Sequence, residues 1–193
     1  MASAGNQPDY IIIGGGSAGC VLAARLSADP SCHVVLLEAG GEDYNPLIHI
    51  PAGYIKTMVN PEMNWMFETE PEEGTGNRRI AIPRGKVLGG SSAINAMLYV
   101  RGQSADYDDW AQRGNRGWSY DDVLPYFRKA EHCEPLANGN DDFHNNFHGV
   151  GGPLNVAEVR TRYEALDRLI QAAETIGYPY NKDYNGTTQD GFG

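Results

Sequence analysis

With 193 residues, the chain is long enough for one domain with a hydrophobic core. Its 41% hydrophobic and 21% charged residues are typical of a soluble globular protein. No stretch approaches the roughly 18 consecutive apolar residues of a membrane-spanning helix. The polar start, residues 1–9, lacks the basic segment of a signal peptide, so we expect a cytoplasmic protein. The net charge of −10 argues against nucleic acid as a partner, because phosphate binding requires clustered Lys and Arg.

The cysteine pattern predicts neither a metal site nor a disulfide framework. Cys20, Cys32 and Cys133 are odd in number and lie far apart without a CxxC spacing. We expect reduced thiols and no metal site.

The first regular segment is a strand–helix–strand pattern. Residues 9–13 are apolar and β-branched and predict a short buried strand that stops at three glycines. Residues 17–28 have helical periodicity, and residues 33–37 predict a second buried strand. The short spacing implies a right-handed parallel βαβ crossover.

Regularity decreases after this unit. Residues 45–83 are rich in Pro, Gly, Asn and Glu and predict an excursion with short strands. Ser119 and Asp122 form a capping-box pattern that predicts a helix running toward Ala130, with Pro125 in its first turns, where the lost N–H costs little. Residues 134–152 predict a loop. A last helix is predicted by apolar residues at helical spacing, ending at Gly177: Leu166, Leu169, Ile170, Ala173 and Ile176.

A GxGxxG motif lies between the first strand and the first helix. Gly14 permits a tight turn, Gly16 lets the backbone approach a pyrophosphate, and Gly19 lets the helix lie close to the strand. The N–H groups at the helix start, at Ser17 and Ala18, would face the phosphates. This context predicts a dinucleotide site.

Glu38, followed by Ala39, stands at the end of the second predicted strand, 19 residues after Gly19. An acid at this place accepts hydrogen bonds from the adenosine ribose hydroxyls and repels a 2′-phosphate. Because FAD and NAD share the same ADP half, the motif leaves open which of them binds.

A second glycine-rich block decides between the two cofactors. Residues 85–108 read GKVLGGSSAINAMLYVRGQSADYD, and this stretch resembles, position by position, the first signature of the glucose–methanol–choline (GMC) oxidoreductases. Flanking pieces such as Asn64-Trp65 and Gly152-Pro153-Leu154 are similar to that family too. The resemblance covers essentially the whole chain and implies an α/β, Rossmann-like FAD-binding domain.

The resemblance places this block along the pyrophosphate and the flavin ring of FAD. The small residues offer backbone N–H groups without bulk, and Asn95 offers an amide donor to the flavin edge. The implied FAD contacts in this block are Val87, Gly90, Ser91, Asn95, Ala96 and Leu98. Some family members attach FAD covalently through a His just before the Asn. Because Ile94 occupies that position, we expect non-covalent FAD.

The resemblance also implies a function and a missing part. Family members oxidise an alcohol by passing a hydride to the flavin, with a catalytic His in the C-terminal half. We therefore expect residues 1–193 to supply the N-terminal part of the FAD domain and the start of the substrate-domain excursion, with no catalytic residue. The remainder of the enzyme is expected as a partner, as a second polypeptide or because this is a partial chain. Two strands leave apolar faces uncovered, so we expect no stable fold alone.

Two other functions stay open from the sequence. The same fold includes FAD-containing lyases, namely hydroxynitrile lyases and a fatty acid photodecarboxylase. A flavin-binding module without turnover is the third possibility.

Weaker candidates have simpler interpretations. His144 and His148 are four residues apart, as a metal pair can be, but their setting predicts loop histidines without metal. The three tryptophans are expected mainly to pack in a core, with Trp65 the best candidate for stacking on a ring.

Overall fold

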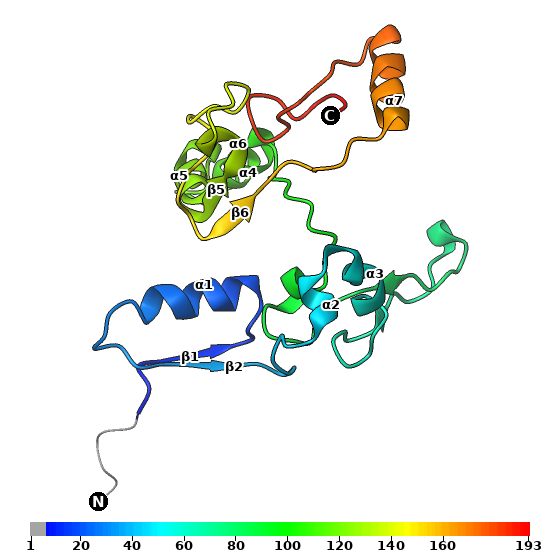
Figure 1. The fold of residues 1–193 in the computed structure, drawn as a ribbon. Coiled ribbons are helices and arrows are strands. Elements are labelled where there is room, and N and C mark those ends of the chain that lie inside the picture. Colours follow the sequence, from blue (N-terminus) through cyan, green and yellow to red (C-terminus); the bar gives the residue numbers. More distant parts are fainter. Residues whose placement is uncertain (1–6) are drawn as a thin grey trace, which may run out of the picture. The chain divides into compact units, whose positions relative to one another are not determined.

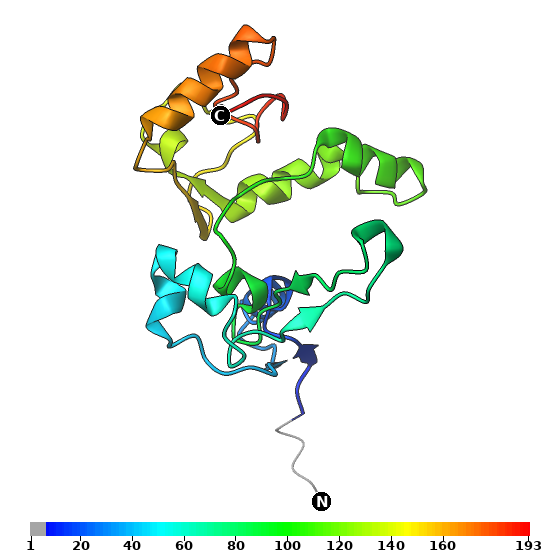
Figure 2. The same cartoon turned by 90° about the vertical axis from the view of Figure 1, so that its right-hand side faces the viewer.

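The computed structural model describes residues 7–193. The chain divides into two compact units, Met1–Leu98 and Tyr99–Gly193 (Figures 1 and 2). Among the described residues, no helix is long and apolar enough to cross a membrane. Residues 1–6 of the polar start lie outside the described part of the chain.

The first unit begins with the predicted βαβ pattern. Strand β1 (Tyr10–Ile13) leads into helix α1 (Ser17–Leu26), and strand β2 (Val34–Leu37) follows. The two strands are parallel, with Tyr10 opposite Val34 and Ile13 opposite Leu37. Helix α1 packs along one face of the pair (Figure 1). The predicted parallel unit is confirmed, although α1 ends before the predicted Ala28.

The prediction that these strands are buried is wrong for this chain. Ile13 is 87% exposed, and Ile11 and Leu37 are exposed as well. The physical reason is that β1 and β2 form a sheet of two strands that only α1 covers. Apolar side chains on the other face therefore remain in contact with solvent.

The rest of the first unit consists of short elements. They are α2 (Pro46–His49), α3 (Tyr54–Thr57), β3 (Phe67–Glu68), β4 (Ala81–Ile82) and 3-10 turns at Pro51–Gly53, Glu73–Thr75 and Gly90–Ala93. Strands β3 and β4 pair antiparallel, as the predicted excursion requires. Met63 of the excursion packs against Val87 and Ile94 of the second glycine block. These three residues form a small hydrophobic core that joins the two segments.

The second unit carries most of the helices. Its elements are α4 (Ser104–Gln112), α5 (Tyr120–Ala130), β5 (Glu131–Cys133), α6 (Glu134–Ala137), β6 (Leu154–Val156) and α7 (Glu164–Thr175). Strands β5 and β6 pair in parallel. The predicted loop at 134–152 begins with the short helix α6 and is otherwise irregular.

Two predicted helices in the second unit are confirmed. Helix α5 starts with the capping box of Ser119 and Asp122, and α7 is followed by Gly177 at φ +93°. Pro125 lies in the first turns of α5, as predicted, but the expectation that its lost N–H costs little is wrong, because it is the sixth residue and lies inside the helix. Since only the first four N–H groups of a helix lack a partner, Pro125 removes one internal hydrogen bond.

The interior of the second unit is mainly polar. Its fully buried hydrophobic residues, within the described chain, are Cys133 and Ala173. Three charged or ionisable side chains are buried beside them: Arg101, Glu131 and His148.

Candidate functional site

The two glycine motifs meet in the first unit. Gly16 and Gly89 form a parallel β-bridge, and the N–H of Gly89 donates to the carbonyl of Gly15 at 2.7 Å. A second bridge joins Gly41 to Val87. Segments about 70 residues apart in sequence therefore share one backbone surface, where β1 and β2 end.

Several glycines are required by this packing. A β-carbon on Gly19 would overlap the carbonyl oxygen of Gly14, and one on Gly90 would lie 2.8 Å from the Cα of Gly16. Gly14 and Gly90 also have φ values of +100° and +58°, which favour glycine. These three positions hold α1 close to β1 and the second block close to the first.

Gly16 is different, because the protein itself leaves room there. Its backbone angles, φ −78° and ψ −171°, suit any residue. A β-carbon on Gly16 would lie 3.9 Å from the Cα of Gly90, which is an ordinary contact. The fold alone does not demand glycine here, whereas a ligand that approaches the backbone would.

The start of α1 suits an anion. Gly16 caps the helix without any side-chain hydrogen bond, and the first turn holds no acidic residue. Ser17 and Ala18, the first two helical residues, are exposed. The N–H groups of this turn and the positive end of the helix dipole therefore face an open space that fits a phosphate.

Glu38 is held at the end of β2 by two backbone donors. Its Oε2 accepts from the N–H of Gly15 at 2.6 Å, and its Oε1 accepts from the N–H of Gly40 at 2.8 Å. A carboxylate has about four acceptor sites, so it can accept further hydrogen bonds from hydroxyl groups. The charged oxygens are thus fixed beside the first glycine motif, as recognition of a ribose requires.

These features surround a cleft of about 760 Å³. Gly14, Gly16, Glu38, Ala39, Gly90 and Ser91, which were predicted from the sequence, line the cleft. The remaining lining residues are Ile13, Leu37, Trp65, Phe67, Ile82, Arg84 and Gly85. Both glycine motifs therefore contribute to a single cavity, which is of the size that cofactor sites have.

Aromatic and basic side chains form one wall of the cleft. This wall was not predicted from the sequence as a unit. Trp65 stacks on Phe67 with the ring centroids 5.9 Å apart, and the Nζ of Lys86 lies 5.0 Å from the Trp65 centroid. The expectation that the tryptophans pack in a core is wrong, because all three are exposed. Trp65 instead offers a flat face at the cleft.

Buried Asn64 fixes this wall. Its Oδ1 accepts from the N–H groups of Met66 and Arg84, both at 2.9 Å, and its Nδ2 donates to the carbonyl of Met58. Met66 has a φ of +54°, so the amide supports an unusual backbone turn between the two stacked rings.

The segment implied to lie beside the flavin ring is exposed. Asn95, Ala96 and Leu98 all face solvent. The Oδ1 of Asn95 accepts from the N–H of Met97 at 3.0 Å and supports a φ of +59° at Met97. No hydrogen bond from the amide nitrogen of Asn95 is found within the described residues, and its donation to the flavin edge stays a prediction.

Three neighbouring residues use their side chains within the protein. The hydroxyl of Ser91 accepts from the N–H of Gly85 at 3.1 Å. Val87 and Ile94 are each 2% exposed and pack in the small core. Any contact of Val87 with a cofactor therefore comes from its backbone.

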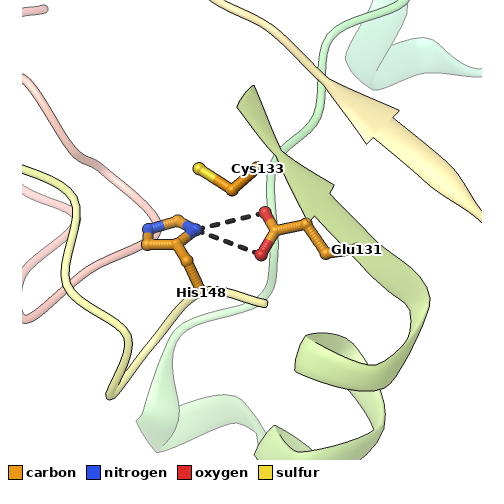
Figure 3. Close-up of side chains that lie close together, drawn as sticks. All are labelled: Glu131, Cys133 and His148. Carbon is orange, nitrogen blue, oxygen red and sulfur yellow. Dashed lines mark hydrogen bonds and ion pairs between the residues drawn. The ribbon is translucent and has the colours of Figure 1, made fainter. Parts of the chain in front are cut away.

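A second cluster of ionisable groups lies in the other unit. His148 is 3% exposed, and its Nδ1 lies 3.1 Å from Oε1 of Glu131 (Figure 3). Its Nε2 lies 3.0 Å from Oδ2 of Asp183, and Arg101 donates to Glu131 at 2.9 Å. Both histidines lie outside helices and strands, as expected of loop histidines, but His148 is buried whereas His144 is exposed.

The charges of this cluster set its protonation. Burial lowers the pKa of His148, but its hydrogen bonds to Asp183 and Glu131 and their charges outweigh burial and raise this pKa to about 9. Burial raises the pKa of Glu131, but hydrogen bonds from His148 and the Gly149 N–H, with the charge of Arg101, lower it overall. The cluster thus contains two cations and two anions at neutral pH.

Glu131, Cys133 and His148 also have the residue types of a metal site (Figure 3). Both ring nitrogens of His148 already face carboxylates, and Arg101 is bound to Glu131. Burial raises the pKa of the Cys133 thiol, which favours its neutral form. This donor set fits an ion-pair cluster better than a metal centre.

Comparison with known proteins identifies the family of the chain. Residues 8–193 match the family of GMC oxidoreductases, and the chain belongs to this family. Its fold is accordingly the N-terminal, FAD-binding α/β part of a GMC oxidoreductase.

Similar proteins include choline dehydrogenases and a pyridoxine oxidase. The chain is 46% identical over 97% of its length to oxygen-dependent choline dehydrogenase of Sinorhizobium fredii, of which it covers 33%. It is 42% identical over its full length to mouse mitochondrial choline dehydrogenase, of which it also covers 33%. The crystal structure of pyridoxine 4-oxidase from Mesorbium loti is similar with a TM-score of 0.82 and 36% identity, over 93% of this chain and 34% of that one. The chain spans about a third of the length of these relatives.

Proposed function

We propose that this chain supplies the FAD-binding part of an enzyme that oxidises an alcohol. The observation that carries the proposal is the meeting of the two glycine motifs around one cleft, with Glu38 fixed at its edge. Membership of the GMC family and similarity to choline dehydrogenases support a CH–OH donor. Choline is the first substrate to test.

The residues of the first unit have separate roles in this proposal. Gly14, Gly16 and Gly19, with the N–H groups of Ser17 and Ala18, bind the pyrophosphate. Glu38 accepts hydrogen bonds from the ribose hydroxyls, and Ala39 lies beside it in the cleft.

The second glycine block orients the reactive half of the cofactor. Gly90 and Ser91 extend the phosphate cradle, with the backbone of Val87 behind them. Asn95 would donate to the flavin edge, and the exposed backbone at Ala96 and Leu98 would run close to the ring. FAD bound here would supply the acceptor for the hydride of the alcohol, and by resemblance to the family the base that would remove the proton belongs to the rest of the enzyme.

We further propose that FAD is held without a covalent bond. Ile94, at the position where some relatives have a linking His, has a hydrocarbon side chain that packs in the core. The remaining two thirds of the enzyme would be supplied by a further polypeptide segment, and we call the whole the assembled enzyme. A second polypeptide, a cytoplasmic location and the absence of nucleic acid from its partners stay predictions.

Anaerobic mixing of the assembled enzyme with alcohols tests the proposed reaction. We expect choline or another primary alcohol to bleach the visible flavin bands, because the flavin takes up the hydride. A matched experiment with betaine, which has no hydroxyl group to oxidise, should leave the bands unchanged. Bound flavin that no alcohol in a broad panel reduces would contradict the proposed oxidation and favour a lyase or a module without turnover.

A further inference from the structure

The buried cluster of the second unit plays no part in the proposed function. It joins four segments of this unit: the backbone around Arg101, strand β5, the turn at 147–149 and the loop at 181–190. We propose that His148 is a pH-dependent latch, which ties the loop at 181–190 to β5 as an imidazolium and loosens this loop in alkaline solution.

The geometry requires both ring nitrogens of His148. Nδ1 faces Glu131 at 3.1 Å, and Nε2 faces Asp183 at 3.0 Å. An ionised carboxylate only accepts hydrogen bonds, so each ring nitrogen of His148 must carry a hydrogen and donate a hydrogen bond. Only the protonated ring has two N–H groups, and the neutral ring can satisfy one carboxylate but not both.

The two carboxylates do not depend on His148 equally. Glu131 also accepts from Arg101 and from the N–H of Gly149, both at 2.9 Å. Asp183 has a further donor only within its own loop, where the N–H of Asn185 lies 3.2 Å from its Oδ1. Loss of the imidazolium charge therefore leaves Glu131 paired, whereas Asp183 keeps at most a neutral N–H donor of His148 in place of a charged one, so the bond that joins its loop to β5 is weakened.

The loop in turn holds the chain around Arg101. The N–H of Arg101 donates to Oδ1 of Asn185 at 2.8 Å, and the Nδ2 of Asn185 donates to the carbonyl of Tyr99 at 2.9 Å. Gln189 donates to the carbonyl of Arg101 at 2.7 Å. These amide contacts do not titrate, so we expect the loop to loosen at Asp183 first and to keep part of its contacts.

The charged and titratable groups around His148 are consistent with a pH dependence that comes from the titration of His148. They are Arg101 and Glu131, Cys133 on β5, Asp183 in the loop, and on α5 both Tyr120 and Arg128, whose Nε donates to the carbonyl of His148 at 3.4 Å. The pKa of His148 is raised from 6.5 to about 9, so the charged ring stabilises the fold fully below pH 6.5. This contribution is lost as the pH rises through about 9. Burial raises the pKa values of Tyr120 and Cys133, so both groups keep their protons to a higher pH than they would in water.

Hydrogen exchange of the loop in the assembled enzyme tests the latch. The measurement is the protection factor of peptides covering 181–190, corrected for the intrinsic pH dependence of exchange, between pH 6 and 10. We expect protection to fall at least about tenfold across pH 9, because one imidazolium bond is lost. Asp183→Asn should give low protection already at pH 7 and no further change with pH.

His144→Gln is the matched control, since His144 is an exposed histidine in the same segment. It should behave like the unmodified protein. His148→Gln removes the charge of the ring itself. If His148→Gln does not fold, Asp183→Asn still tests the proposal. Protection that stays constant across pH 9, or that is the same in Asp183→Asn as in the unmodified protein, would overturn the proposal. Low protection already at pH 7 in His144→Gln, as expected for Asp183→Asn, would overturn it too.

Discussion

Replacing Gly19 by alanine is expected to destabilise the first unit by about 3 kcal/mol or more and to abolish cofactor binding. The new β-carbon would overlap the carbonyl oxygen of Gly14, so α1 must move away from the turn after β1. Alanine has a helix propensity about 1 kcal/mol better than glycine, but this gain is smaller than the cost of the overlap. The measurements are the flavin content of the assembled enzyme and its unfolding in urea.

Gly41→Ala is the matched control for this substitution. Gly41 lies beside the same site, yet no atom is within 4 Å of a β-carbon built on it. We expect that variant to keep its stability within about 0.5 kcal/mol and to retain FAD. If Gly19→Ala behaved like Gly41→Ala, the close packing of α1 on the first glycine turn would be contradicted.

Replacing Gly16 by alanine should separate folding from binding. Because a β-carbon there meets only Gly90 at 3.9 Å, we expect the free energy of unfolding without cofactor to change by less than about 1 kcal/mol. Gly16 lines the cleft in which we propose the pyrophosphate, so the added methyl group would take up room there. We therefore expect FAD affinity to fall roughly 100-fold, equivalent to about 2.7 kcal/mol.

The Gly16 prediction is measured by titrating FAD into the apoprotein of the assembled enzyme, followed by flavin fluorescence. Thermal unfolding of the same apoprotein reports on its fold. Unchanged affinity with an intact fold would contradict the placement of the pyrophosphate at Gly16. A loss of the fold would mean that this glycine is required by the protein rather than by the ligand.

Much of the cleft was accessible from the sequence because its parts are local. The GxGxxG turn, α1 and the acid after β2 lie within one βαβ unit, so their spacing predicts their arrangement. The contact between Gly16 and Gly89 is different, because no local pattern relates segments so far apart. Resemblance to a family with the same second block supplied that part.

The solvent exposure of the strands and the buried ionic cluster could not be predicted from local sequence patterns. The apolar letters of β1 predict a buried strand, but burial depends on what covers the sheet, and Ile13 is 87% exposed. His148 contacts residues 17 and 35 positions away, so no helix or strand period connects them. No sequence pattern relates Arg101, Glu131, His148 and Asp183, and their pairing becomes visible only when the fold buries them, since buried ionisable groups must be paired.

The most direct test of the central claim is the flavin content of the purified assembled enzyme, before and after denaturation. The account predicts visible flavin absorbance in the native sample and one FAD per chain in the supernatant once the protein is denatured and removed. Protein that folds without flavin, and that does not take up added FAD, would contradict the assignment of the glycine cleft as the FAD site.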